Sequence, residues 1–189
     1  MLPKDIKGVM TDIGGVLYVG EVAIPDTPQT LNLIRKHYPL RLITNTTRIT
    51  PESIIKNMEI MGFEIHKEEM YTALAATKDY VKSQGYTVYS VLTDQATVYF
   101  SELAGTNPSC VVVGDAHTNF DFEHINTAFR HLEKGAALVA TSNSRYFKDS
   151  DGKLTVGAGG FVTALEFASG KLAKIIGKPE NSFFHLVAA

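Results

Sequence analysis

Apolar runs that end in polar residues recur in the first part of the chain. Residues 6–11 close on Asp12-Ile13-Gly14-Gly15, and residues 40–44 form a second run that stops at a polar segment. Both runs predict buried strands that end in loops. Between and after them, apolar residues recur at helical spacing, with Pro28 and Pro51 in the predicted first turns. This alternation predicts an α/β fold with a parallel sheet, in which functional groups lie at the carboxyl ends of the strands.

The middle of the chain repeats this pattern. Further strands separated by helical patterns are predicted at 87–92, 110–113 and 137–141. Residues 144–160 are polar and rich in glycine, which predicts a loop or hairpin before an apolar helix that begins near Phe161. Residues 174–176 predict another strand, and a helix begins close to the end of the chain.

Composition narrows the kinds of partner. The 189 residues are 44% hydrophobic and 20% charged, which is typical of one large or two small soluble globular domains. A net charge of -2 gives no basic field that would attract nucleic acid or a membrane surface, so we expect a small-molecule partner. Cys110 is the single cysteine and excludes an internal disulfide. Without a signal-peptide pattern or a long apolar stretch, we expect a cytoplasmic protein.

Three polar groups fall at predicted strand ends and have complementary chemistry. Asp12 could attack phosphorus, the hydroxyl of Thr44 and the amide of Asn45 could hold phosphate oxygens, and Lys178 could neutralise charge. A carboxylate that approaches a phosphate also needs a divalent cation, and Mg²⁺ suits a site made of oxygen ligands. Each residue taken alone is more often an ordinary turn, cap or loop residue, so the prediction depends on their combination.

Three motifs resemble those of the haloacid dehalogenase superfamily, in the same order along the chain. They are Thr11-Asp12-Ile13-Gly14-Gly15-Val16-Leu17, Leu42-Ile43-Thr44-Asn45 and Ile176-Gly177-Lys178-Pro179. The long insert before the third motif resembles the cap domain of the branch that contains NagD-like phosphatases and 4-nitrophenylphosphatase. Within that branch, residues 144–166 look especially like the phospholysine phosphohistidine inorganic pyrophosphate phosphatase group and the haloacid-dehalogenase-like hydrolase domain-containing protein two group.

The resemblance implies a discontinuous Rossmann-like core and an inserted α/β cap. The core would comprise residues 1–78 and 171–189, and the cap residues 79–170. The cap would close over the site and select the leaving group. Within it, Asn143, Ser144 and Arg145 are the residues expected to contribute to specificity. The expected partner is a small phosphorylated substrate or pyrophosphate.

The resemblance also implies a role for each motif residue. Asp12 would be the nucleophile and a Mg²⁺ ligand, and Gly14 would offer its backbone carbonyl to the same ion. Thr44 would hold the phosphoryl group, with Asn45 helping its loop to contact phosphate. Lys178 would orient Asp12 and balance charge. The implied activity is that of a Mg²⁺-dependent phosphatase or pyrophosphatase with an aspartyl-phosphate intermediate.

Gly14 is the first departure from the family pattern. Most phosphatases of the superfamily have a second aspartate at this position, which protonates the leaving oxygen, and the two groups named above typically have serine there. Without that acid, substrates whose leaving group is a weak base are favoured, since general acid help is worth about 10² to 10⁴ in rate. We therefore expect pyrophosphates, phosphoamides or aryl phosphates to react faster than alkyl esters.

The second departure concerns the family's fourth motif, an acidic cluster that completes the Mg²⁺ site. It should follow Lys178, where Glu180 is the sole acid. The core is therefore expected to be incomplete at its carboxyl end, either in a truncated chain or in a naturally short one. Weak metal binding is expected, and an unpaired sheet edge would favour self-association, such as a homodimer.

Two alternatives differ in class from an enzyme of this kind. A catalytically silent relative that binds a ligand or protein through its cap is favoured by Gly14 and the missing motif, whereas the retained Asp12, Thr44 and Lys178 favour the enzyme. A nucleotide-binding Rossmann module is disfavoured because Gly14 and Gly15 do not form the spaced glycine fingerprint.

Overall fold

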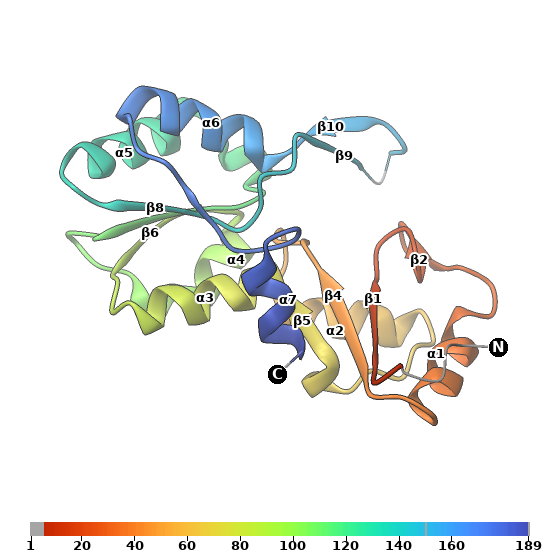
Figure 1. Cartoon of the computed structure of the whole chain (residues 1–189). Helices are drawn as coiled ribbons and strands as arrows, with labels where there is room; N and C mark the ends of the chain where they lie inside the picture. Colours follow the sequence, from red (N-terminus) through yellow and green to blue (C-terminus); the bar gives the residue numbers. More distant parts are fainter. Residues whose placement is uncertain (1–5, 150, 189) are drawn as a thin grey trace. The chain divides into compact units, whose positions relative to one another are not determined.

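The computed structural model describes residues 6–149 and 151–188 and divides into two compact units (Figure 1). The first unit comprises Met1–Thr44 and Pro51–Tyr71, and the second comprises Asn45–Thr50 and Thr72–Ala189. The short segment 45–50 therefore belongs to the second unit although both of its flanking segments belong to the first. This segment begins with Asn45, the last residue of the second motif.

The first unit contains a three-stranded sheet in the order β1-β4-β5. Its elements are β1 (Val9–Asp12), the hairpin strands β2 (Tyr18–Val19) and β3 (Val22–Ala23), α1 (Thr27–Arg35), β4 (Leu40–Thr44), α2 (Pro51–Ile60), a 3-10 turn (Lys67–Glu69) and β5 (Met70–Thr72). β1 and β4 pair in parallel, with Asp12 opposite Ile43. Pro28 and Pro51 both stand at helix starts, as the sequence predicts, because their fixed φ angle suits a first turn.

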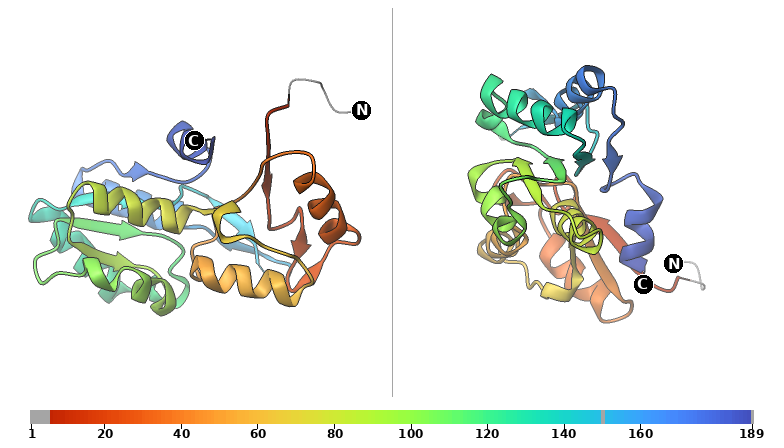
Figure 2. Two further views of the ribbon diagram at one scale, coloured as in Figure 1. Left: turned by 90° about the horizontal axis from the view of Figure 1, so that it is seen from below. Right: turned by 90° about the vertical axis from the view of Figure 1, so that its left-hand side faces the viewer.

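The second unit contains a four-stranded sheet in the order β11-β8-β7-β6, with every neighbouring pair parallel. Its strands are β6 (Val88–Val91), β7 (Cys110–Val113), β8 (Ala137–Ala140) and β11 (Lys174–Ile175). Its helices are α3 (Ala73–Ser83), α4 (Asp94–Tyr99), α5 (Phe122–Glu133), α6 (Ala158–Ser169) and α7 (Asn181–Ala188), with 3-10 turns at Ser101–Leu103 and His117–Asn119. Figure 1 shows α5 and α6 on one face of this sheet and α3 and α4 on the other, and the left view of Figure 2 looks onto α3 and α4.

The sheet of the second unit is buried on both faces, which explains the continuous apolar run in β7. All four residues of Cys110–Val113 have no exposed surface. Burial also raises the pKa of the Cys110 thiol to about 12, so this cysteine stays protonated and inert. On the α5 and α6 side, Leu132 and Leu165 pack into the cluster that contains Val111 and Val113.

A hairpin precedes α6, in agreement with the loop or hairpin predicted for residues 144–160. β9 (Tyr146–Lys148) and β10 (Leu154–Val156) pair antiparallel. α6 begins at Ala158, three residues before the predicted start near Phe161. The glycines that predicted a loop lie instead at the start of this helix. Glycine is needed at position 157, because a side chain there would meet the carbonyl oxygen of Ser144.

These elements confirm the predicted fold class, a mixed α/β fold with parallel sheets. The strands predicted around residues 6–11, 40–44, 87–92, 110–113, 137–141 and 174–176 are all present, with bounds that differ by a few residues. In the described part of the chain, every helix is too short or too polar to span a bilayer.

Leu132 provides a test of the core of the second unit. Leu132→Ala should lower the free energy of unfolding by about 2–5 kcal/mol, because it opens a cavity in a fully buried cluster. Leu172→Ala is the matched control, since Leu172 is 87% exposed and its truncation should change stability by about 0.5 kcal/mol or less. Urea unfolding of both variants measures the difference, and equal losses would contradict the described packing.

Candidate active site

Asp12 and Thr44 occupy the carboxyl ends of neighbouring parallel strands in the first unit, as predicted. Each is the last residue of its strand, and Thr44 follows the residue that pairs with Asp12. Asp12 is exposed, whereas Thr44 is 3% exposed. The Oδ1 atom of Asp12 accepts a hydrogen bond from the backbone N–H of Ile13 at 2.8 Å, which fixes the direction of the carboxylate.

The loop after Asp12 turns tightly around Ile13. The carbonyl of Ile13 accepts from Leu17 N at 2.8 Å, and Gly15, with φ of 77°, donates its N–H to the carbonyl of Tyr18 at 2.8 Å. Burial raises the pKa of Tyr18, and the carboxylate of Asp12 raises it further, so the phenol stays neutral beside the acid. Sequence reasoning missed Tyr18, which comes close to Asp12 only through this turn.

Gly14 has an open environment. An added Cβ would find no described atom within 4 Å, and the φ angle of Gly14 lies outside the left-handed region. Local packing therefore does not require glycine here. A larger residue at position 14 would fit in the fold.

Asn45 and Lys178 meet in the second unit although 133 residues separate them. The side-chain N–H of Asn45 donates to the carbonyl of Lys178 at 2.8 Å, and the backbone N–H of Lys178 donates to Oδ1 of Asn45 at 2.9 Å. This reciprocal pair satisfies both backbone groups of Lys178. The structure thus brings the second and third motifs together through the backbone of Lys178, which is partly buried.

Gly177 makes this contact sterically possible. Its N–H donates to the carbonyl of Thr141 at 2.9 Å, just beyond β8. An added Cβ would collide with that same carbonyl and would lie 2.6 Å from Oδ1 of Asn45 and 2.8 Å from Cβ of Ala73. Glycine at this position is therefore a packing requirement.

Asn143, Ser144 and Arg145 lie between β8 and β9, against the start of α6. The N–H of Gly159 donates to the carbonyl of Ser144 at 3.0 Å, and the N–H of Gly157 donates to the carbonyl of Arg145 at 3.0 Å. Asn143 and Arg145 are exposed. The backbone of this segment is thus fixed while two of its side chains face solvent.

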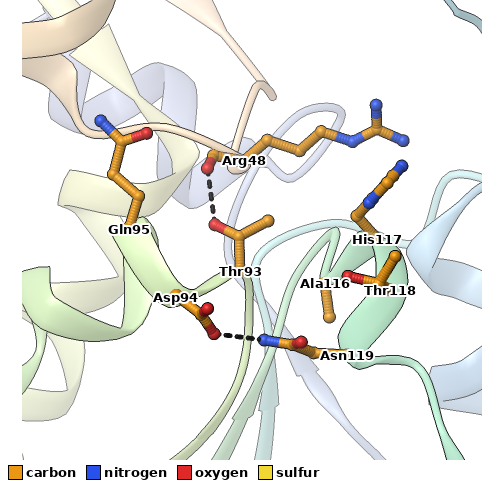
Figure 3. A pocket seen from close by; sticks show the side chains of 8 residues that line it. All are labelled: Arg48, Thr93, Asp94, Gln95, Ala116, His117, Thr118 and Asn119. Atoms are coloured by element: carbon orange, nitrogen blue, oxygen red, sulfur yellow. Dashed lines mark hydrogen bonds between the residues drawn. The ribbon is translucent and has the colours of Figure 1, made fainter.

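Arg48 is a residue that sequence reasoning missed. Its guanidinium bonds Asp115 at 2.8 Å and Asp149 at 3.0 Å, and its backbone carbonyl accepts from the hydroxyl of Thr93 at 2.6 Å. Arg48 also lines a pocket of about 430 Å³ with Thr93, Asp94, Gln95, Ala116, His117, Thr118 and Asn119 (Figure 3). The sequence gives no signal for these contacts, since the two carboxylates lie 67 and 101 residues away.

The predicted metal donors are all oxygen atoms, which suits Mg²⁺. They are the carboxylate of Asp12 and the backbone carbonyl of Gly14, two residues apart on one tight loop. Within residues 6–149 and 151–188, no three or more His, Cys, Asp or Glu side chains gather as metal ligands would. With only these two predicted donors from the protein, water would have to complete the coordination of the ion.

In the first unit, two parallel strands end in the exposed carboxylate of Asp12 and in Thr44, and in the second unit Asn45 holds the backbone of Lys178. A family model described as haloacid dehalogenase-like hydrolase matches residues 9–105. Haloacid dehalogenase-like hydrolase domain-containing protein 2 of Mus musculus is 34% identical over 182 residues, covering 96% of this chain and 70% of the mouse protein. The chain belongs to the haloacid dehalogenase-like hydrolase family.

Other relatives agree with this assignment. Phospholysine phosphohistidine inorganic pyrophosphate phosphatase of Homo sapiens is 32% identical over 187 residues, covering 95% of this chain and 68% of the human protein. Two solved structures share the fold at lower identity. The 4-nitrophenylphosphatase of Thermotoga maritima has a TM-score of 0.86 at 19% identity, covering 97% of this chain and 72% of its own. NagD of E. coli K-12 has a TM-score of 0.83 at 24% identity, covering 96% and 73%.

Gly177 provides a test of the contact between the second and third motifs. Gly177→Ala should lower the free energy of unfolding by about 1–3 kcal/mol, because the added methyl group meets backbone that cannot move freely. Gly14→Ala is the control and should change stability by about 0.5 kcal/mol or less. Thermal or urea unfolding measures both, and a neutral Gly177→Ala would contradict the described close approach.

Proposed function

We propose that the chain is a Mg²⁺-dependent phosphatase that acts on small phosphorylated compounds or pyrophosphate, with Asp12 as its nucleophile. The observation that carries this proposal is the exposed carboxylate of Asp12 at the carboxyl end of β1, in a chain of the haloacid dehalogenase-like hydrolase family. Functional groups of parallel α/β sheets lie at this end of the strands. Residues 79–170 would act as the cap.

The proposed reaction has two steps. A carboxylate oxygen of Asp12 attacks phosphorus, and the bond from phosphorus to the leaving oxygen breaks with its electron pair passing to that oxygen. The product is an acyl phosphate on Asp12. Water then attacks this intermediate, which releases inorganic phosphate and restores the carboxylate. The hydrogen bond from Ile13 N holds Asp12 in one orientation, so less rotamer entropy is lost in reaching the phosphorus.

Thr44, Asn45 and Lys178 would serve the phosphoryl group. A hydroxyl and backbone N–H groups can hold phosphate oxygens, and the ammonium group of Lys178 can offset their negative charge. The reciprocal hydrogen bonds with Asn45 fix the backbone of Lys178, from which the side chain with this ammonium group extends. Mg²⁺ bound by Asp12 and the Gly14 carbonyl would supply further positive charge against the phosphate.

The relatives suggest the class of substrate. One is named for phospholysine, phosphohistidine and inorganic pyrophosphate, and another for 4-nitrophenyl phosphate. Pyrophosphate and 4-nitrophenyl phosphate have weakly basic leaving groups, which depend less on a positioned acid. This matches the glycine at position 14, where the side chain cannot donate a proton.

A catalytically silent relative that binds its ligand through the cap is the alternative function. Gly14 favours this alternative function, because the site then has no side chain at this position that could act as a general acid. The two functions differ in one respect that can be measured: only the enzyme depends on the carboxylate of Asp12.

Asp12→Asn should abolish Mg²⁺-dependent phosphate release from pyrophosphate and from 4-nitrophenyl phosphate, with a loss of at least about 10³-fold in kcat. The amide is nearly isosteric with the carboxylate and lacks its nucleophilic charge. The exposed Asp79→Asn on α3 is the matched control and should keep the wild-type rate. Equal background rates in wild type and Asp12→Asn would leave the binding function standing.

Gly14→Asp should speed the hydrolysis of an alkyl phosphate such as a sugar phosphate by about 10² or more in kcat/KM, by supplying the missing general acid. The open space around Gly14 accommodates the side chain. Gly14→Ala is the control and should leave the slow alkyl rate unchanged. The ratio of kcat/KM for alkyl and aryl substrates is the measurement, and rapid alkyl turnover by the wild type would disprove the assignment of weakly basic leaving groups.

A further inference from the structure

Arg48 connects three separate segments of the second unit. Its Nε donates to Oδ2 of Asp115, in the loop after β7, at 2.8 Å. One terminal nitrogen donates to both carboxylate oxygens of Asp149 at 3.0 and 3.2 Å. Asp149 follows β9 in the β9–β10 hairpin. The guanidinium also lies over the ring of Phe147 in β9, 4.9 Å from its centroid. One side chain therefore fixes the hairpin by charge and by stacking.

The segment that carries Arg48 is itself held at several points. Asn45 forms the reciprocal pair with Lys178, and the hydroxyl of Thr47 accepts from the backbone N–H of Asp115 at 2.9 Å. The carbonyl of Arg48 accepts from Thr93 at the start of α4 (Figure 3). Residues 45–48 thus join the third motif at one end to the β9–β10 hairpin at the other.

Arg48 supplies the positive charge that the two carboxylates of this cluster share. The side chains of Arg48, Asp115 and Asp149 keep between 19% and 26% of their surface exposed, so solvent screens their charges only in part. Two carboxylates face one guanidinium. Removal of Arg48 would leave Asp115 and Asp149 as two like charges without their shared partner, which would push the hairpin away from the β7 end.

We propose that Arg48 is a positioning residue that holds the β9–β10 hairpin at a fixed place relative to Asn45 and Lys178, and so sets how well the leaving group is bound. The proposal rests on the proposed phosphatase function. The hairpin continues directly from Asn143–Arg145, whose backbone is bonded to the start of α6, so a displaced hairpin would move relative to that segment. Pyrophosphate, whose leaving group is itself a small phosphate, would depend less on the hairpin than a larger aryl phosphate does.

The test compares Arg48→Ala and Arg48→Lys with Arg130→Ala, a matched control at an exposed arginine of α5. Two readouts are measured on the full chain: hydrogen–deuterium exchange of residues 146–156, and kcat and KM for 4-nitrophenyl phosphate and pyrophosphate. Arg48→Ala should speed hairpin exchange and raise KM for the aryl phosphate about tenfold, which corresponds to 1.4 kcal/mol. The pyrophosphate kcat should stay within about twofold. Arg48→Lys should fall between, since an ammonium group cannot bridge both acids and stack on Phe147 as well.

A double variant separates positioning from general loss of stability. Asp149→Asn in the Arg48→Ala background removes the repulsion between the two acids, so exchange and KM should move back towards wild type. Hairpin exchange or an aryl phosphate KM that matches Arg130→Ala would overturn the proposal, as would equal losses on both substrates. Failure of the phosphatase function is distinguishable, because it requires that the wild type itself releases no Asp12-dependent phosphate.

Discussion

The reciprocal hydrogen bonds between the Asn45 side chain and the Lys178 backbone are the interaction on which the rest of the site depends. A side-chain amide here replaces the partner that a neighbouring strand would give to Lys178, and it does so across 133 residues. The contact demands that the preceding residue have no side chain, since a Cβ on Gly177 would collide with Thr141 and crowd Asn45. Because Asn45 also follows Thr44 directly in the chain, one short segment links the phosphate-binding residues proposed in both motifs.

The same segment explains how a residue outside the motifs acquires a role. Arg48 lies three residues after Asn45, and its contacts with Asp115, Asp149 and Phe147 extend the fixed geometry from Lys178 to the hairpin. A charge-assisted network of this kind is geometrically specific even where its net contribution to stability is modest, because the planar guanidinium bonds only in particular directions. Under the proposed function, specificity for the leaving group would then depend on how the hairpin is held.

Much of the fold could be predicted because its strands are buried on both faces. A run such as Cys110–Val113 has no polar side chain that could face solvent, so the sequence alone predicts an interior parallel strand. The ends of these runs placed Asp12 and Thr44 correctly, since a parallel sheet gathers carboxyl ends on one edge. The site residues that were predicted are those that stand at such ends or match a family motif.

The remaining features depend on contacts that a sequence does not display. β2 and β3 have two residues each, too few for any alternation to be recognised. The sequence predicts the start of α6 too far along the chain, because glycines normally indicate loops. In the structure, Gly157 is needed for the close approach of Ser144. In the sequence Arg48 looks like an ordinary polar loop residue, because the two carboxylates that bind it lie far away along the chain.

The central claim is that Asp12 forms a covalent bond to phosphorus, and acid-quenched protein from a reaction with 4-nitrophenyl phosphate and Mg²⁺ tests it most directly. Mass analysis of the digested protein should find one phosphoryl group on the peptide that contains Asp12, with no such adduct when the substrate is omitted. A chain that releases phosphate while no phosphoryl group accumulates on that peptide, or while one accumulates elsewhere, would contradict the account.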